Sequence, residues 1–230
     1  EPLMAFFWAV LAPSLFLTGA ALVAYEFVPE FETGSALEIR AYQTLWFVSC
    51  LAMAAWFAVM SVWSNWLGAG PFAGRMTTDS TWISIAVILG PIILLVPNVI
   101  VASVMTEEGW QYNGDVNQDV FQPRNWTLAF IFVSVIMAPI VEDVAFRGIA
   151  LGALIARGLS PIGAVVLSSF AFAFSHLQYS PAAMFVVFLS GIGFAILRLV
   201  SGTVIVPIIA HGAANGVVLS LNWLAANPPT

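Results

Sequence analysis

The sequence predicts an all-α fold, a polytopic bundle of about seven or eight transmembrane helices, and three observations support this prediction. Hydrophobic residues make up 61% of the 230-residue chain and charged residues only 8%, whereas a soluble domain carries about 25% charged residues. The apolar residues stand in continuous runs of about 20, the length that a helix needs to cross a bilayer. Because these runs do not alternate between apolar and polar residues, a transmembrane β-barrel is disfavoured.

Seven apolar runs are each expected to form a helix. They cover about residues 3–25, 41–67, 81–105, 126–156, 161–177, 181–200 and 203–225. Pro91 and Pro97 are expected to kink the third run, because proline removes a helical hydrogen bond. The fourth run is either one long helix or two pieces broken near Pro139 or Gly148.

Residues at the ends of the later runs are typical of helix boundaries. Ser160 and Ser180 each precede a proline, which predicts an N-cap serine with proline at the first helical position. Gly202 predicts a stop after the sixth run, and Asn227, with the prolines that follow it, closes the seventh. The chain has no internal repeat or low-complexity linker, so residues 1–230 are expected to form a single integral membrane domain.

The charged residues exclude some functions and suggest an orientation. The net charge is −6 and there is no basic patch, so nucleic-acid binding is not expected. The lone Cys50 excludes an intramolecular disulfide and a cysteine metal cluster. Loops 26–40 and 106–125 are acidic, whereas the opposite connections carry arginine. Those arginines are Arg75, Arg157 and Arg198. The positive-inside rule therefore predicts that the N-terminus and these turns face the cytoplasm.

Strongly polar residues lie inside apolar runs of the second half of the chain. An acid or an arginine at the centre of a transmembrane helix costs about 2.5–3.5 kcal/mol on insertion scales. The residues in question are Glu142, Asp143, Arg147, His176, His211 and Asn215. They occupy three predicted helices, and we expect them to converge on a functional site.

Helical spacing sorts these residues into faces. Asp143 and Arg147 are four residues apart and share a face, so they are expected to neutralise each other. Glu142 points about 100° away from Asp143, which leaves it for chemistry. His211 and Asn215 are also four residues apart and share a face of the last run.

Neighbouring residues support close packing, and they allow a purely structural interpretation. Phe172 and His176 share a face, and Gly212 with Gly216 forms a small-residue pair that allows a second helix to approach. The charged cluster could instead be a structural ion-pair network. In that alternative His176 is an interhelical hydrogen-bonding residue and Asn215 holds helices together.

Three motifs resemble a known family. They are E-D-x-x-x-R at 142–147, F-x-x-x-H at 172–176 and H-x-x-x-N at 211–215, in that order on successive predicted helices. This combination resembles the CPBP family of intramembrane proteases, which includes type II CAAX prenyl endopeptidases and bacterial bacteriocin-processing or self-immunity proteins. The resemblance covers about residues 126–220. It implies variable N-terminal helices over 1–125 and catalytic-type helices over 126–225.

The resemblance implies a role for each motif residue. Glu142 is expected to activate a water molecule, with His176 beside that water. Asp143 stands where the family usually has a second glutamate, so the supporting interaction is one methylene shorter. His211 and Asn215 are expected to stabilise the oxyanion, and Phe172 and Arg147 support the site.

The chemistry of amide hydrolysis suits these residues. It needs a base for water and donors for the tetrahedral oxyanion. No serine or cysteine stands in a nucleophile motif, and H-E-x-x-H is absent. The resemblance implies a metal-independent glutamate protease without a cofactor, although a zinc site of His176, His211 and Glu142 has suitable ligand types.

The predicted function is therefore that of an intramembrane endopeptidase, a multi-pass hydrolase of the bacterial cytoplasmic membrane. Its partners would be a peptide or membrane-protein substrate and the lipid bilayer, with other membrane subunits as further candidates. Two alternatives stay open. The chain could be a CPBP-like scaffold or subunit without proteolytic activity, or a pigment or haem protein that uses His176 and His211 as ligands.

Overall fold

The computed structural model describes residues 78–105, 128–176 and 179–227, together with scattered helical positions between 40 and 58. In these described residues every regular element is a helix, which confirms the all-α class. The first predicted run, 3–25, and nearly all of the second, 41–67, lie outside the described residues. The number of seven or eight helices and the single-domain boundary therefore stay predictions.

Four long helices match predicted runs closely. They are α3 (Ser80–Met105), α7 (Pro161–Phe174), α8 (Pro181–Ser201) and α9 (Ile205–Ala226). The described part of the chain has three helices long and apolar enough to cross a membrane, and these are α3, α8 and α9. Pro91 and Pro97 lie inside α3 without ending it. Helix α7 ends three residues before its predicted boundary, at Phe174.

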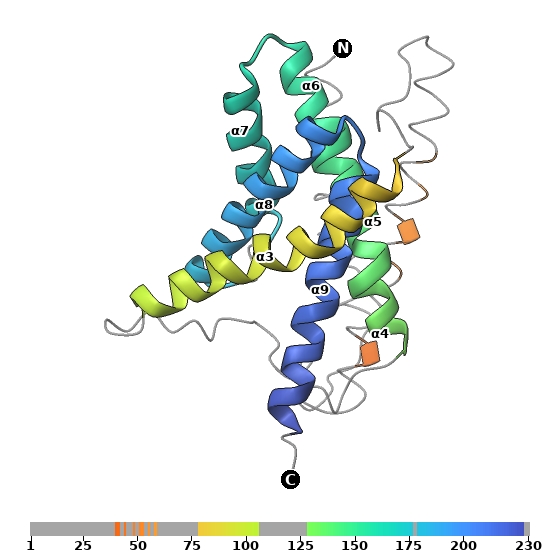
Figure 1. The fold of residues 1–230 in the computed structure, drawn as a ribbon, viewed down its shortest axis with the longest axis vertical. Helices are drawn as coiled ribbons and strands as arrows, with labels where there is room; N and C mark the ends of the chain where they lie inside the picture. Colours follow the sequence, from red (N-terminus) through yellow and green to blue (C-terminus); the bar gives the residue numbers. More distant parts are fainter. Residues whose placement is uncertain are drawn as a thin grey trace.

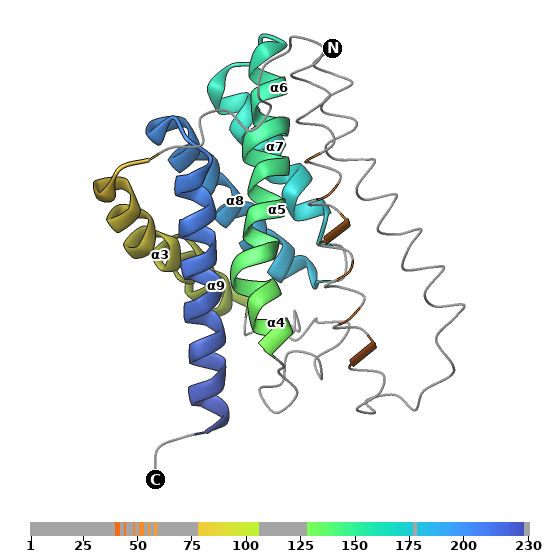
Figure 2. The same cartoon turned by 90° about the vertical axis from the view of Figure 1, so that its right-hand side faces the viewer.

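The fourth predicted run is helical throughout its described part, residues 128–156, and it contains π-helical segments at the two places where a break was expected. It consists of α4 (Leu128–Phe132), the π-helical segment η2 (Val133–Met137), α5 (Ala138–Asp143), the π-helical segment η3 (Val144–Ala150) and α6 (Leu151–Ala156). Figure 2 shows these pieces as one upright rod beside α9. Segment η2 directly precedes the turn that holds Pro139, and η3 contains Gly148. A π-helical segment shifts the hydrogen-bond register without ending the helix, and such segments are frequent at functional sites.

The predicted helix boundaries are confirmed at their caps. The hydroxyl groups of Ser160 and Ser180 each accept a hydrogen bond from the backbone N–H three residues later, at 3.2 Å in both cases. Proline follows each of these serines as the first helical residue. Gly202 ends α8 in the left-handed region, with φ of 71°, where glycine is favoured because it has no Cβ.

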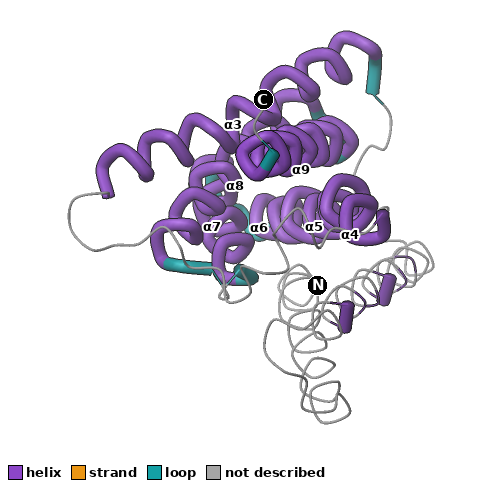
Figure 3. Tube along the Cα trace, turned by 90° about the horizontal axis from the view of Figure 1, so that it is seen from below, coloured by secondary structure: helices purple, strands orange, loops and turns teal. Residues whose placement is uncertain are grey.

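Helix α9 is the central element of the described bundle. It packs against α3 on one side and against η2 and α5 on the other, while α8 packs against both α7 and α3. Figure 1 shows α3 crossing α9 at a steep angle. Seen along its axis, α9 lies between α3 and the rod that contains α4 and α5 (Figure 3).

Two glycines bring neighbouring backbones close to α9 on either side of His211. Gly90 of α3 lies directly against the backbone of Ala210, and a Cβ at Gly90 would overlap the Ala210 carbonyl. On the other side, a Cβ at Gly212 would be 2.7 Å from the carbonyl oxygen of Val135. The predicted close approach at Gly212 is therefore confirmed, and the backbone that carries His211 is held between two helices.

Candidate functional site

Asp143 and Arg147 form the buried ion pair that their spacing predicts. Asp143 Oδ1 lies 3.2 Å from Arg147 Nη1, and the two side chains are 0% and 2% exposed. The contact is electrostatic rather than an aligned hydrogen bond, because neither atom has a hydrogen-bond partner among the described residues. Removing one charge of such a buried pair would leave the other uncompensated.

The guanidinium of Arg147 is also held by aromatic rings. Its Cζ lies 4.1 Å from the ring centroid of Phe172 and 5.4 Å from that of Phe194. A guanidinium is attracted to the faces of aromatic rings, and this attraction strengthens when water is excluded. Arg147 is therefore compensated by one carboxylate and two phenyl rings.

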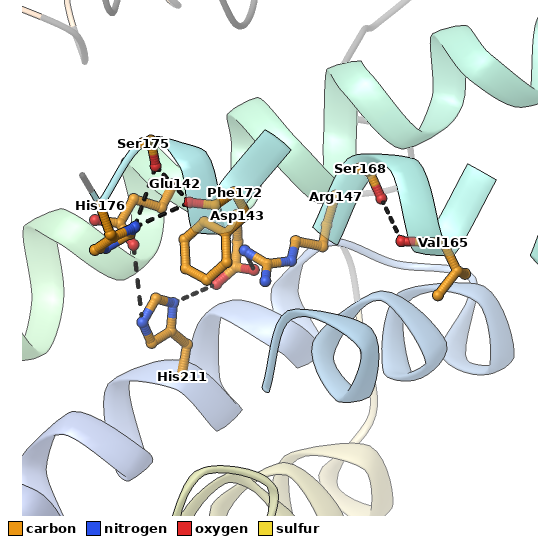
Figure 4. Close-up of polar contacts among 9 residues, drawn as sticks. All are labelled: Glu142, Asp143, Arg147, Val165, Ser168, Phe172, Ser175, His176 and His211. Carbon is orange, nitrogen blue, oxygen red and sulfur yellow. Dashed lines mark hydrogen bonds and ion pairs between the residues drawn. The ribbon is translucent and has the colours of Figure 1, made fainter. Parts of the chain in front are cut away.

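Asp143 makes a second contact, which helical spacing alone did not predict. Its Oδ2 lies 3.1 Å from Nδ1 of His211, on α9. Asp143 thus joins Arg147 of its own rod to the histidine of another helix (Figure 4). Because a carboxylate only accepts hydrogen bonds, this contact places a hydrogen on Nδ1.

Glu142 turns away from Arg147, as predicted, and faces His211. Its Oε2 lies 3.8 Å from Nε2 of that ring. The Glu142 side chain is 23% exposed, whereas its neighbour Asp143 is fully buried at 0%. Of the two adjacent acids, Glu142 is therefore the one that a water molecule or a substrate can reach.

His176 lies on the turn that follows α7, so its predicted position inside the helix is wrong. The chain leaves the helix at Ser175, where the N–H of His176 bonds the carbonyl of Ala173, three residues back. The extended backbone of Ser180 then leads into the proline that starts α8. The predicted pairing with Phe172 is nevertheless present, because His176 Nδ1 lies 2.9 Å from the Phe172 carbonyl oxygen.

Phe172 brings the three motifs together. Its ring centroid lies 4.9 Å from that of His176 and 6.0 Å from that of His211, edge to face in both cases. The same ring lies under the Arg147 guanidinium. Figure 4 shows these side chains gathered from three separate segments of the chain. The convergence expected from the sequence is therefore present for the charged cluster and both histidines.

Among the described residues, the side chain of Asn215 forms a hydrogen bond with the backbone of η2 and not with the charged cluster. Its Nδ2 donates a hydrogen bond of 2.8 Å to the backbone carbonyl of Ser134, in η2. This contact fits the alternative in which Asn215 holds two helices together. Its predicted role as an oxyanion donor stays a prediction.

The arrangement does not provide the alternative zinc site. Among the described residues, no group of three or more histidine, cysteine, aspartate and glutamate side chains has a geometry that could hold a metal ion. His176, His211 and Glu142 are therefore not placed as a zinc ligand set.

Sequence reasoning missed two residues of this region, Phe194 and Ser134. Phe194 lies on α8, a helix without any of the three motifs, and no pattern in the sequence distinguishes it from other apolar residues. Ser134 contributes a backbone carbonyl, which carries no signal from its side chain. Pro139, five residues later, was the available clue, because proline lacks the N–H that a helical carbonyl needs.

Comparison with known proteins identifies the same part of the chain. Residues 124–217 match the family model described as type II CAAX prenyl endopeptidase Rce1-like, and this segment contains all three motifs. No curated protein and no solved structure matches the chain. The match agrees with the resemblance seen in the motifs and confirms it over residues 124–217, the part of the chain that is similar to the Rce1-like type II CAAX prenyl endopeptidases.

Proposed function

We propose that this protein is an intramembrane endopeptidase that hydrolyses a peptide bond with a water molecule activated by Glu142. One observation carries the proposal. Glu142 is the partly exposed acid of the cluster, and its carboxylate lies 3.8 Å from Nε2 of His211. A general base must lie within hydrogen-bond reach of the proton that it removes, and a partly exposed carboxylate is open to a water molecule.

The proposed reaction uses Glu142 to move one proton. The carboxylate accepts a proton from water while the water oxygen attacks the carbonyl carbon, and the carbonyl oxygen becomes the oxyanion. When the tetrahedral intermediate collapses, the C–N bond breaks and Glu142 returns the proton to the departing amine. No covalent enzyme intermediate is needed.

His176 would orient the attacking water. Its Nδ1 faces the Phe172 carbonyl oxygen at 2.9 Å, and a carbonyl can only accept, so Nδ1 carries the hydrogen of the neutral ring. Nε2 is then an acceptor. It would hold one hydrogen of the water while Glu142 removes the other.

His211 would stabilise the oxyanion in its doubly protonated form. With one hydrogen on Nδ1 directed at Asp143, a neutral ring has a bare Nε2 and cannot donate from it. The imidazolium can donate a hydrogen bond from Nε2. In that state the negative charges of Glu142 and Asp143 are balanced by the positive charges of His211 and Arg147. Asn215 would supply the second donor, because only one hydrogen of its Nδ2 is used at Ser134.

The substrate would be a peptide or membrane protein that reaches the site through the bilayer. The described part of the chain has three helices long and apolar enough to cross a membrane, which supports an integral membrane enzyme. The family description names a prenylated CAAX tail as one substrate class, and other peptides of the bacterial cytoplasmic membrane are the second. Other membrane subunits stay candidate partners.

The experiment compares the purified protein with Glu142→Gln in lipid vesicles. The probes are a fluorogenic farnesylated CAAX peptide and, in cells expressing each form, mass spectrometry of new protein termini in the membrane fraction. We expect cleavage by the unmodified protein and none by Glu142→Gln. Asp79→Asn, which removes an exposed acid at the start of α3, is the matched control for loss of one negative charge and should stay active. Cleavage that survives Glu142→Gln would refute the base assignment.

The same samples test the two alternatives. A scaffold without proteolytic activity would give no new termini with any variant, and would instead copurify with other membrane subunits. A pigment or haem protein would show a visible absorption band that disappears when His176 or His211 is replaced. Neither result is expected for the endopeptidase.

A further inference from the structure

Helix α8 contributes an aromatic residue to a site whose motifs lie on other elements. The ring of Phe194 stacks on that of His211, with centroids 4.9 Å apart and an interplanar angle of 23°. Its centroid also lies 5.4 Å from Cζ of Arg147. Phe194 is 1% exposed, so it contacts these two groups without being open to a substrate.

The contacts of His211 leave its ring little freedom. Nδ1 faces Asp143 at 3.1 Å, Phe194 stacks on the ring plane, and Phe172 meets the ring edge to face. Of its two nitrogens, Nε2 is the one that faces Glu142. Rotation of the ring about its Cβ–Cγ bond would break the stacking and the Asp143 contact together.

We propose that Phe194 is a positioning residue that fixes the ring plane of His211 and thereby keeps Nε2 directed toward Glu142. The inference rests on the proposed function for its catalytic consequence, but the ring contact itself does not. An aromatic face also attracts a cationic ring, so the same stacking suits the imidazolium form. The charged groups facing His211 are Asp143 and Glu142, and Arg147 reaches it through Asp143.

If Phe194 only filled the apolar core, any apolar side chain of similar size would suit its position. Phe194 belongs to a buried cluster between α3, α8 and α9, with Ala86, Leu197, Val206, Ala210 and Ala214. Leucine would keep that cluster apolar but has no flat ring to stack on His211. The substitution Phe194→Leu therefore separates packing from positioning.

The matched control is Phe130→Leu. Phe130 is also 1% exposed, but it lies on α4, in the rod rather than on α8. We expect both variants to have a lower melting temperature in detergent. Only Phe194→Leu should lower kcat per folded molecule, by about tenfold, because displacement of a catalytic group is costly for rate. KM should change little, and Phe194→Tyr, which keeps the ring, should recover most of the rate.

A spectroscopic measurement tests the ring contact without any enzymatic assay. The chain has two histidines, so histidine ring labelling gives two sets of resonances, and His176→Gln assigns them. Loss of the stacked ring in Phe194→Leu should move the ring-proton resonances of His211 downfield, and Phe130→Leu should leave them in place.

The outcomes separate this inference from the proposed function. Unchanged His211 resonances in Phe194→Leu, or an equal change in Phe130→Leu, would overturn the positioning role. An equal loss of kcat in the two leucine variants would overturn it as well. If Glu142→Gln still cleaves while His211 shifts only in Phe194→Leu, the proposed mechanism fails and the ring contact stands.

Discussion

The side chain of Asn215 satisfies a backbone carbonyl that Pro139 leaves without a helical partner. In η2 the N–H of Ala138 bonds Val133 rather than Ser134, so the α-helical donor for Ser134 is already used. The donor in π-helical register would be residue 139, which is proline and has no N–H. Nδ2 of Asn215 takes its place at 2.8 Å.

We therefore predict that Asn215→Ala loses both stability and activity. A buried carbonyl without a partner costs about 1–3 kcal/mol in the free energy of unfolding. Loss of one oxyanion donor typically lowers the rate by about 10²–10³-fold. The measurements are melting temperature in detergent and cleavage rate per folded molecule.

The cause of the stability loss can be isolated with Pro139→Ala. Alanine restores an N–H at residue 139, which can supply the Ser134 carbonyl in place of Asn215. In a double-mutant cycle, Asn215→Ala should therefore be less destabilising in the Pro139→Ala background than alone. Strict additivity of the two melting-temperature changes would mean that proline does not create the need for Asn215.

Substitutions of the two adjacent acids, Glu142 and Asp143, should have different effects on stability and activity. Asp143→Asn leaves Arg147 without its carboxylate, and breaking a buried ion pair costs about 3–5 kcal/mol. It also changes the group that faces Nδ1 of His211, so we expect low melting temperature and reduced activity together. Glu142→Gln should melt normally and show no turnover. A stable but inactive Asp143→Asn, or an unstable but active Glu142→Gln, would mean that the roles are reversed.

Arg147→Lys should be destabilising although it keeps the charge. An ammonium group lacks the flat guanidinium surface that lies over the rings of Phe172 and Phe194, at 4.1 and 5.4 Å from their centroids. We expect a loss of about 1–2 kcal/mol from the weakened cation–aromatic contact. The assay is denaturant unfolding in mixed micelles. Arg157→Lys, at the exposed end of α6, is the control and should unfold like the unmodified protein.

Gly212 should tolerate no side chain, whereas Gly216 should. A Cβ at Gly212 would stand 2.7 Å from the Val135 carbonyl oxygen, but one at Gly216 would meet its nearest neighbour at 3.8 Å, an ordinary contact. Gly212→Ala should therefore cost about 1–3 kcal/mol, as overpacking does, and it should displace His211 and lower the rate. Gly216→Ala, one turn later on the same helix, should be nearly neutral in thermal unfolding. Similar melting temperatures for the two variants would contradict the close contact between α9 and η2.

Apolar runs and short spacings predicted what depends on neighbours along the chain. The helices of the described part follow from continuous apolar runs, and their serine caps and the Asp143–Arg147 pair follow from spacings of three or four residues, which a helix fixes locally. The family followed from three short motifs, and residues 124–217 match it. The position of His176 was mistaken because the predicted run extended to residue 177, at an isolated Leu177, whereas α7 ends at Phe174.

The sequence by itself determined the all-α class, the membrane character and which polar residues would lie together in the candidate site. Only the tertiary structure decided which of these side chains contact each other, because the contacts join distant parts of the chain. Asp143 was expected to pair only with Arg147, and it also contacts His211, which lies 68 positions away in the sequence. Asn215 was expected at the oxyanion, and it bonds a carbonyl 81 positions away. Phe194 carried no local signal at all, since its stacking on His211 depends on the crossing of two helices rather than on the residues beside it.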